Sequence, residues 1–229
     1  MRVLRHRASS GPRTVAPSVM AGTTSSNDDG PARPETVASR PKTAKAAFAR
    51  LVEGNLRFSS RAPRVASAAE IDEMFQRNVA GQSPYATILT CADSRLSPNM
   101  LFDEFLGELF VVREAGNIAV SPTSLGSLEF ARLVLGTSLL VVMGHEGCGA
   151  VRAALEGADV PGNVKAVIEA IQPGIRGASN LDDAVTKNVR AVIESIRANS
   201  PALDDAAIVG AIYHLGTGEV HFLDPAPSN

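Results

Sequence analysis

Short apolar runs alternate with amphipathic stretches along most of the chain. Four runs rich in β-branched residues predict buried strands, at residues 86–90, 109–112, 139–143 and 207–213. Between and after them, apolar residues recur at helical spacing and predict helices, at residues 124–135, 149–155, 163–171 and 182–198. Strands that alternate with helices indicate an α/β fold with a mostly parallel central sheet flanked by helices.

The two ends of this pattern add further elements. Gly216 and Gly218 predict a hairpin turn into an antiparallel C-terminal edge strand at residues 220–223. A short helix is expected at residues 71–79. Before it, an N-terminal helical arm begins near Thr43 and packs on its own core or on a partner subunit, with an apolar face formed by Phe48, Leu51, Val52 and Leu56.

The first 42 residues are expected to lie outside the fold, as a disordered tail or a transit peptide, ahead of one domain at residues 43–229. Residues 1–27 hold four arginines, no acidic residue and no apolar segment, which excludes a secretory signal. This composition is typical of an organelle transit peptide and equally of a plain disordered tail. The expected location is therefore intracellular and cytoplasmic, or a plastid or mitochondrion if residues 1–27 are a transit peptide.

Composition narrows the function classes. The chain has 229 residues, 45% of them hydrophobic and 20% charged, as in a soluble globular protein. A net charge of -2 and 4% aromatic residues give no basis for binding nucleic acid. No apolar run approaches the roughly 20 residues that a membrane span needs.

The candidate chemistry gathers around the two cysteines of the chain, Cys91 and Cys148. Cys91 directly follows one predicted strand, while His145 and Cys148 follow another. The carboxyl ends of parallel strands share one edge of a sheet, so neighbouring strands would bring the three side chains together. Two thiolates and an imidazole suit zinc, and three ligands leave a fourth position open for catalysis. A disulfide is the simpler alternative, but the surroundings of both cysteines disfavour it.

Two segments resemble the zinc-binding signatures of the β-class carbonic anhydrases. They read Cys91-Ala92-Asp93-Ser94-Arg95 and Gly144-His145-Glu146-Gly147-Cys148-Gly149. The resemblance spans roughly residues 43–223 and continues through Gly107-Glu108-Leu109-Phe110-Val111-Val112-Arg113, Ala115-Gly116-Asn117 and Gly126-Ser127-Leu128-Glu129-Phe130-Ala131.

This resemblance implies one Zn²⁺ per subunit, held by Cys91, His145 and Cys148, and reversible hydration of CO₂ to bicarbonate. Arg95 would keep Asp93 ionised, so that Asp93 accepts a hydrogen bond from zinc-bound hydroxide. In a closed state, as in some members of the family, Asp93 would become the fourth zinc ligand. Gly116 and Asn117 would bring backbone N–H groups to the substrate.

One segment departs from the family pattern. Many relatives carry a glutamine shortly before the second strand, and its amide is thought to contact substrate. Here Glu104 or Phe105 occupies that place, and both are candidate substrate-binding residues. An ionised carboxylate cannot donate a hydrogen bond, so we expect an altered pocket. The usual tyrosine of the following helix is also replaced, by Phe130.

Alternatives remain open at this point. A CS₂ or COS hydrolase of the same family would use the same metal site. A zinc-stabilised structural or regulatory homologue is a different class, which the presence of Asp93 and Arg95 disfavours. A cysteine-nucleophile enzyme using Cys148 and His145 is the third. The expected partners are CO₂ or bicarbonate and further copies of the chain, in a homodimer or a larger homo-oligomer.

Overall fold

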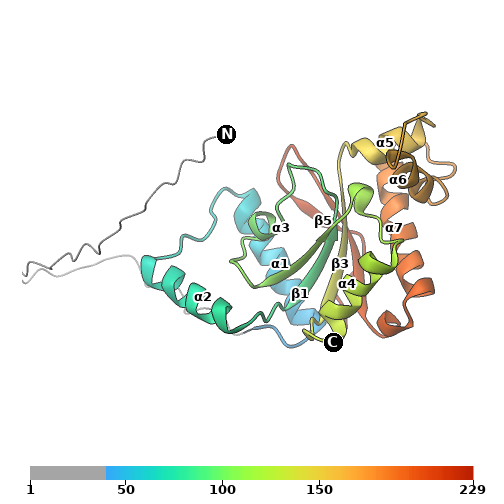
Figure 1. Ribbon diagram of the computed structural model, residues 1–229. Coiled ribbons are helices and arrows are strands. Elements are labelled where there is room, and N and C mark those ends of the chain that lie inside the picture. Colours follow the sequence, from blue (N-terminus) through green and yellow to red (C-terminus); the bar gives the residue numbers. More distant parts are fainter. Residues whose placement is uncertain (1–39, 229) are drawn as a thin grey trace, which may run out of the picture. The chain divides into compact units, whose positions relative to one another are not determined.

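A five-stranded sheet organises residues 40–228, the part of the chain that this computed structural model describes (Figure 1). The strand order is β2-β1-β3-β4-β5; the first four strands run parallel and β5 pairs antiparallel with β4. This confirms the predicted α/β fold and its antiparallel edge strand. The strands are β1 (Ala86–Thr90), β2 (Leu109–Arg113), β3 (Leu139–His145), β4 (Ala207–Tyr213) and β5 (Val220–Phe222).

The sheet carries the apolar core along its centre. Every residue of β1 and β3 is buried, as expected of strands with neighbours on both sides and helices on both faces. In the register of these two strands, Thr90 pairs with Met143. The segment after Cys91 and the end of β3 at His145 therefore lie at the same edge of the sheet.

Helices surround the sheet, at α1 (Ala44–Ser59), α2 (Ala68–Ala80), α3 (Pro98–Leu101), α4 (Pro122–Leu133), α5 (Gly149–Leu155), α6 (Val164–Ile171) and α7 (Leu181–Asn199). Short 3₁₀ turns occur at η1 (Ala115–Asn117) and η2 (Pro201–Leu203). The predicted helix at residues 124–135 begins two residues earlier, because Ser121 caps it and Pro122 stands at its first turn. The pattern did not predict α3 and η1, which are too short to show a period.

The N-terminal helix α1 packs on the core of its own chain, against β3 and α3. Thr43 caps it as expected, with its side chain accepting from the N–H of Ala46. Of the predicted apolar face, Val52 and Leu56 are 41% and 64% exposed in the single chain, so these two are left for the alternative of packing on a partner subunit. The buried face is formed instead by Ala44, Ala47, Leu51, Gly54 and Asn55.

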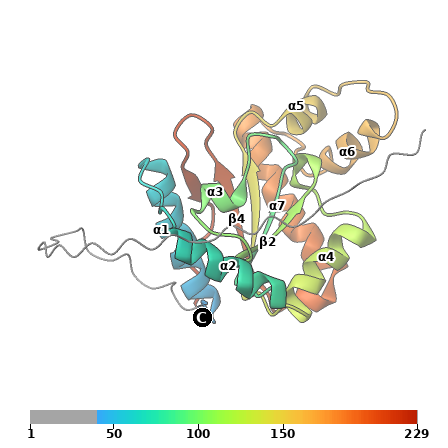
Figure 2. The same cartoon turned by 60° about the vertical axis from the view of Figure 1, so that its left-hand side comes forward.

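Helix α7 covers the opposite side of the sheet from α1, over β3 and β4 (Figures 1 and 2). Its close approach requires Gly144 in β3, because a Cβ atom there would lie 2.8 Å from Val189 Cγ2. The N-cap Asn180 accepts from the N–H of Asp183 and completes the first turn. The fit of α7 against β3 thus fixes the strand that ends in His145.

The predicted tail lies almost wholly outside the described residues, as does the segment considered as a transit peptide. Arg40, the first described residue, donates to the carbonyl oxygens of Pro84 and Leu135 at 2.7 and 3.0 Å. Among residues 40–228, no helix is long and apolar enough to cross a membrane.

Candidate metal centre

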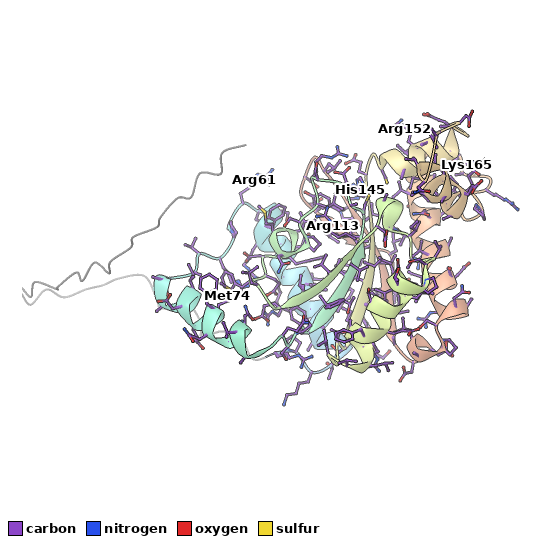
Figure 3. All side chains as sticks on the ribbon, in the orientation of Figure 1. Arg61, Met74, Arg113, His145, Arg152 and Lys165 are labelled. Atoms are coloured by element: carbon purple, nitrogen blue, oxygen red, sulfur yellow. The ribbon has the colours of Figure 1, made fainter. Side chains whose placement is uncertain are left out.

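Three potential metal ligands meet at the carboxyl edge of the sheet. Cys91 directly follows β1, His145 ends β3, and Cys148 stands at the N-cap of α5. Figure 3 labels His145 and also Arg113, the last residue of β2, which the strand registers place at this same edge of the sheet. The two cysteines, 57 positions apart in the chain, come together because β1 and β3 are parallel neighbours.

The ligand atoms of Cys91, His145 and Cys148 all lie within 4.8 Å of one another. All three residues are buried, at 5%, 0% and 1% exposure. His145 Nδ1 lies 2.9 Å from the carbonyl oxygen of Glu146, while the buried Nε2 has no hydrogen-bond partner among the described residues. Metal-binding histidines commonly use one ring nitrogen for a hydrogen bond and the other for the metal. His145 is oriented in this way, with Nδ1 engaged and Nε2 unpaired. The sulfur and nitrogen donors suit zinc.

The two sulfurs favour one negative charge between them, on Cys91. The backbone N–H of Gly116 donates to Cys91 Sγ at 3.3 Å. The neighbouring Cys148 thiol is the main reason that the pKa of Cys91 falls below its usual range. In turn, proximity to Cys91 and burial raise the pKa of Cys148. The pair therefore holds one thiolate readily, and a metal must displace the second proton when it binds.

Asp93 and Arg95 form a two-pronged ion pair beside the three ligands. Arg95 donates from Nε to Asp93 Oδ1 at 2.9 Å and from Nη2 to Oδ2 at 2.7 Å. These hydrogen bonds lower the pKa of Asp93 well below its usual range, so its carboxylate stays ionised. Asp93 Oδ2 lies 3.8 Å from His145 Nε2, which places the carboxylate next to the metal position while Arg95 holds both of its oxygens.

Arg113 is a supporting residue that was not singled out from the sequence. It donates from Nη2 to the carbonyl oxygen of Asp93 at 2.6 Å and from Nε to that of Cys91 at 3.3 Å. Its position at the end of β2, in register with Thr90, lets it reach both carbonyls. Arg113 therefore holds the turn that presents Cys91 and Asp93.

The predicted Gly116–Asn117 loop lies against Cys91, but its backbone N–H groups are not free for a substrate as expected, because they donate to Cys91 Sγ and to the carbonyl oxygen of Glu114. Both residues are buried, and both have positive φ, 70° at Gly116 and 48° at Asn117. A Cβ atom at Gly116 would lie 2.5 Å from Ile171 Cδ1, so the close approach requires glycine. Asn188 of α7, which the sequence pattern did not single out, donates from Nδ2 to the carbonyl oxygen of Gly116 at 2.9 Å. Its one available signal was a polar residue within the apolar stripe of α7.

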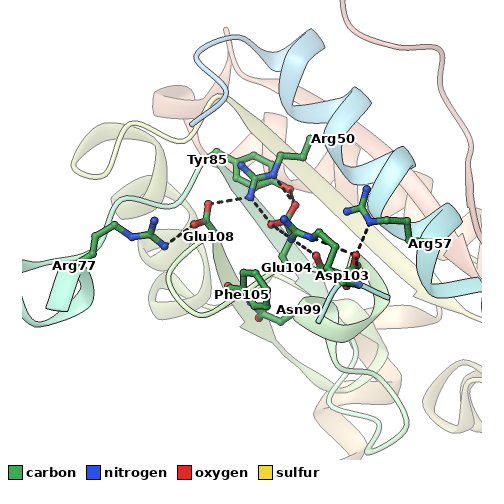
Figure 4. A network of polar contacts seen from close by, with 10 residues as sticks. Arg50, Arg57, Arg77, Tyr85, Asn99, Asp103, Glu104, Phe105 and Glu108 are labelled. Atoms are coloured by element: carbon green, nitrogen blue, oxygen red, sulfur yellow. Dashed lines mark hydrogen bonds and ion pairs between the residues drawn. The ribbon is translucent and has the colours of Figure 1, made fainter. Parts of the chain in front are cut away.

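The structure gives Glu104 partners other than the metal ligands. Its carboxylate accepts from Arg50 Nε at 2.7 Å, from Arg50 Nη2 at 2.5 Å and from the Tyr85 hydroxyl at 3.0 Å (Figure 4). Its side chain is fully buried. Phe105 is partly buried, and the guanidinium of Arg64 lies over its ring at 4.8 Å. Neither residue has a described hydrogen bond or ion pair to Cys91, Asp93, Arg95, His145 or Cys148.

Glu104 belongs to a larger set, which we call the arginine–carboxylate network: Arg50, Arg57, Arg64, Arg77, Asp103, Glu104 and Glu108. Arg57 pairs with Asp103 at 2.5 Å and Arg77 with Glu108 at 2.8 Å. Burial by itself lowers the pKa of Arg50, but the hydrogen bonds and charge of Glu104 raise it above its usual value. The network ties α1, α2 and the segment between them to the loop before β2.

Sequence comparison places these features in a known family. The family described as "Carbonic anhydrase" matches residues 86–220, which include every ligand of the candidate centre. Carbonic anhydrase 2 of Mycobacterium tuberculosis is 37% identical over 194 residues, covering 78% of this chain and 92% of that protein. The chain belongs to the β-carbonic anhydrase family. A carbonic anhydrase of Pseudomonas aeruginosa is 30% identical over 197 residues, covering 77% of this chain and 87% of that one.

Solved structures of the family share the fold. The β-carbonic anhydrase CcaA superposes with a TM-score of 0.61 at 25% identity, covering 78% of this chain and 95% of that one. A β-carbonic anhydrase from Coccomyxa gives a TM-score of 0.61 at 26% identity, over 77% and 86% of the two chains. The chain is thus a member of an enzyme family across nearly all of its described residues.

Proposed function

We propose that this protein catalyses the reversible hydration of CO₂ to bicarbonate and a proton, with one Zn²⁺ per subunit. The observation that carries the proposal is the buried Cys91–His145–Cys148 cluster beside the ionised Asp93. The unpaired Nε2 of His145 and the two adjacent sulfurs fit the ligand set of a catalytic zinc site with one open position. When bound there, zinc would act as a Lewis acid that makes water a nucleophile near neutral pH.

Asp93 would orient the attacking water. An ionised carboxylate only accepts hydrogen bonds, so Asp93 can take one from the water while the other side of the oxygen faces CO₂. Arg95 keeps the Asp93 carboxylate ionised and fixes its orientation, because both hydrogen bonds from Arg95 would be lost if the carboxylate rotated. Because the N–H groups of Gly116 and Asn117 already have partners, this loop offers the substrate oxygens the buried Nδ2 of Asn117, which has no hydrogen-bond partner among the described residues.

The direct test is stopped-flow CO₂ hydration of the wild-type protein and of Asp93→Asn. Asparagine keeps the shape of the side chain but loses its charge, and we expect the turnover to fall about 100-fold. Zinc content, measured in parallel, should stay at one per subunit. Wild-type protein without stoichiometric zinc, or an Asp93→Asn protein with undiminished turnover, would contradict the proposal.

Assays of COS and CS₂ hydrolysis on the same samples separate the two related activities that the metal site could also support. The proposal expects CO₂ to be the best substrate by kcat/KM. It also expects both thiols to remain reduced for metal binding, which fits an intracellular location. Faster turnover of COS or CS₂ than of CO₂ would assign the site to that hydrolysis.

We also propose that the protein forms a homodimer or a larger homo-oligomer. Helix α2 has no buried residue, yet Ile71, Phe75 and Val79 place exposed apolar side chains one turn apart along it. A second copy of the chain would cover this stripe. Light scattering after size exclusion should give a mass of at least two subunits, and Phe75→Glu should lower it; a monomeric wild type would refute the assembly.

A further inference from the structure

Asn188 is a buried polar residue in a helix face that is otherwise apolar. It is 2% exposed and lies on α7 beside Val185 and Val189, which pack on β3. Asparagine is a poor residue for a helix interior, and its buried amide needs hydrogen-bond partners. Its side-chain nitrogen reaches out of the helix to the η1 turn, 2.9 Å from the carbonyl oxygen of Gly116 and 3.5 Å from Asn117 Oδ1.

The same peptide segment touches a metal ligand on its other side. The N–H of Gly116 donates to Cys91 Sγ at 3.3 Å, and the carbonyl of Gly116 accepts from Asn188. Gly116 is therefore held between a helix amide and a sulfur. Ile171 and Ala150 close the remaining space around it, so the peptide has little room to move. The two contacts are made by consecutive peptide groups that meet at the Gly116 Cα, so a shift of the carbonyl can be passed on to the N–H and its hydrogen bond to Cys91.

We propose that Asn188 is a positioning residue of the metal centre, acting through Gly116 to keep an N–H directed at the sulfur of Cys91. This proposal rests on the proposed function in that it takes the Cys91–His145–Cys148 cluster to bind zinc. A thiolate that accepts a hydrogen bond gives less charge to a metal, and such outer contacts orient and tune the ligands. Asn188 would thus offset part of the charge that two thiolates bring to the zinc.

The experiment compares Asn188→Leu with a matched control, Asn55→Leu. Leucine keeps the branched shape of asparagine, with bulkier methyl groups, and removes the amide. Asn55 is also buried, and it donates to the carbonyl oxygens of Leu101 and Gly218 rather than to the metal loop. Both variants lose buried hydrogen bonds in the core, but only the first should affect the cluster. All proteins are purified with zinc bound and checked for folding by circular dichroism.

Two readouts follow the metal rather than turnover. Because the Cys91 ligand is no longer held in place from the outside once the amide is lost, release of zinc to a coloured chelator should be about tenfold faster in Asn188→Leu than in wild type, and unchanged in Asn55→Leu. With Co²⁺ in place of zinc, the sulfur-to-metal charge-transfer band should move to longer wavelength in the Asn188 variant alone. Equal release rates and equal bands in wild type and Asn188→Leu would overturn the proposal, as would equal acceleration in both variants.

A second variant keeps the test decisive if leucine prevents folding. Asn188→Ala removes the amide without placing a branched side chain against the Gly116 carbonyl. Faster zinc release and a charge-transfer band at longer wavelength are again expected. Failure of the proposed function is separately visible, since it would appear as wild-type protein that binds no zinc. Zinc-bound wild type with an indifferent Asn188 would refute only the positioning role.

Discussion

The metal centre and the arginine–carboxylate network are both buried clusters of polar side chains, and they differ in how their groups are paired. In the network, each of the three carboxylates accepts hydrogen bonds at both oxygens. In the metal centre, His145 Nε2 is buried without a partner among the described residues, and two thiols face it. Unpaired atoms that converge on one point mark a place for a ligand, whereas carboxylates paired at both oxygens mark a structural tie, in which Arg50 Nη1 is one nitrogen left without a partner among the described residues.

The ion pairs of the two clusters also differ in how far they are exposed to solvent. Arg95 binds Asp93 from the solvent side, because the Arg95 side chain is 53% exposed. This ion pair therefore lies at an open edge of the protein. Arg50 holds Glu104 in the interior, where the side chains are 13% and 0% exposed. A buried charge that loses its partner is strongly destabilising, while an ion pair at the surface contributes little to stability. Changes to the network should therefore affect folding, and changes to the metal centre should affect chemistry.

The largest expected effect is the loss of activity and zinc when a ligand of the metal centre is removed. Cys148→Ser removes one of three ligands, so activity should fall at least about a thousandfold and zinc should be lost. Removing zinc from the wild type with dipicolinate should have the same effect, reversed by added Zn²⁺. Turnover and metal content are measured together. A Cys148→Ser protein that keeps both would remove Cys148 from the centre.

Glu104→Gln tests the network from its most buried carboxylate. The amide leaves Arg50 with less than its full counter-charge, and the free energy of unfolding should fall by about 3 kcal/mol. In the folded protein kcat/KM should stay within about twofold of wild type. Glu53→Gln, the same change at an exposed position of α1, the helix that carries Arg50, is the control. Unchanged stability with altered turnover or bicarbonate affinity would instead place residue 104 in the substrate pocket.

A double variant sharpens the contrast by removing both charges. Arg50→Met together with Glu104→Gln leaves no uncompensated charge from this pair. It should therefore be more stable than the sum of the single losses predicts, by about 1–3 kcal/mol. Urea unfolding of the wild type, both single variants and the double variant gives this coupling. Strictly additive losses would show that the two residues do not act as a pair.

The smallest effect concerns the hydroxyl of Tyr85. Tyr85→Phe removes one hydrogen bond to Glu104 while Arg50 still pairs with the carboxylate, and should lower the free energy of unfolding by about 1 kcal/mol. Tyr213→Phe is the matched control, because the Tyr213 hydroxyl has no hydrogen bond within residues 40–228. Equal losses in the two variants would show that the hydroxyl of Tyr85 adds nothing to the network.

Much of the fold was predictable because its strands are short, β-branched and bounded by turns. Helix α7 was also predictable, because its apolar residues recur at helical spacing. On α1, Val52 and Leu56 do not meet the core of their own chain, because periodicity alone does not say which apolar residues of a helix pack on the sheet. The turns α3 and η1 carry too few residues for any pattern, yet η1 holds Gly116 against Cys91.

The sequence by itself determined the ligand types, their strand-end positions and the family, because these depend on residue identity and spacing along the chain. Only the tertiary structure decided which groups meet. The parallel pairing of β1 with β3 brings Cys91 to His145 and Cys148, and the packing of α7 brings Asn188 to Gly116. The tertiary structure also pairs Glu104 with Arg50 and Tyr85 through hydrogen bonds. Such contacts join residues 19 to 72 positions apart, and local patterns carry no information about pairing over that range.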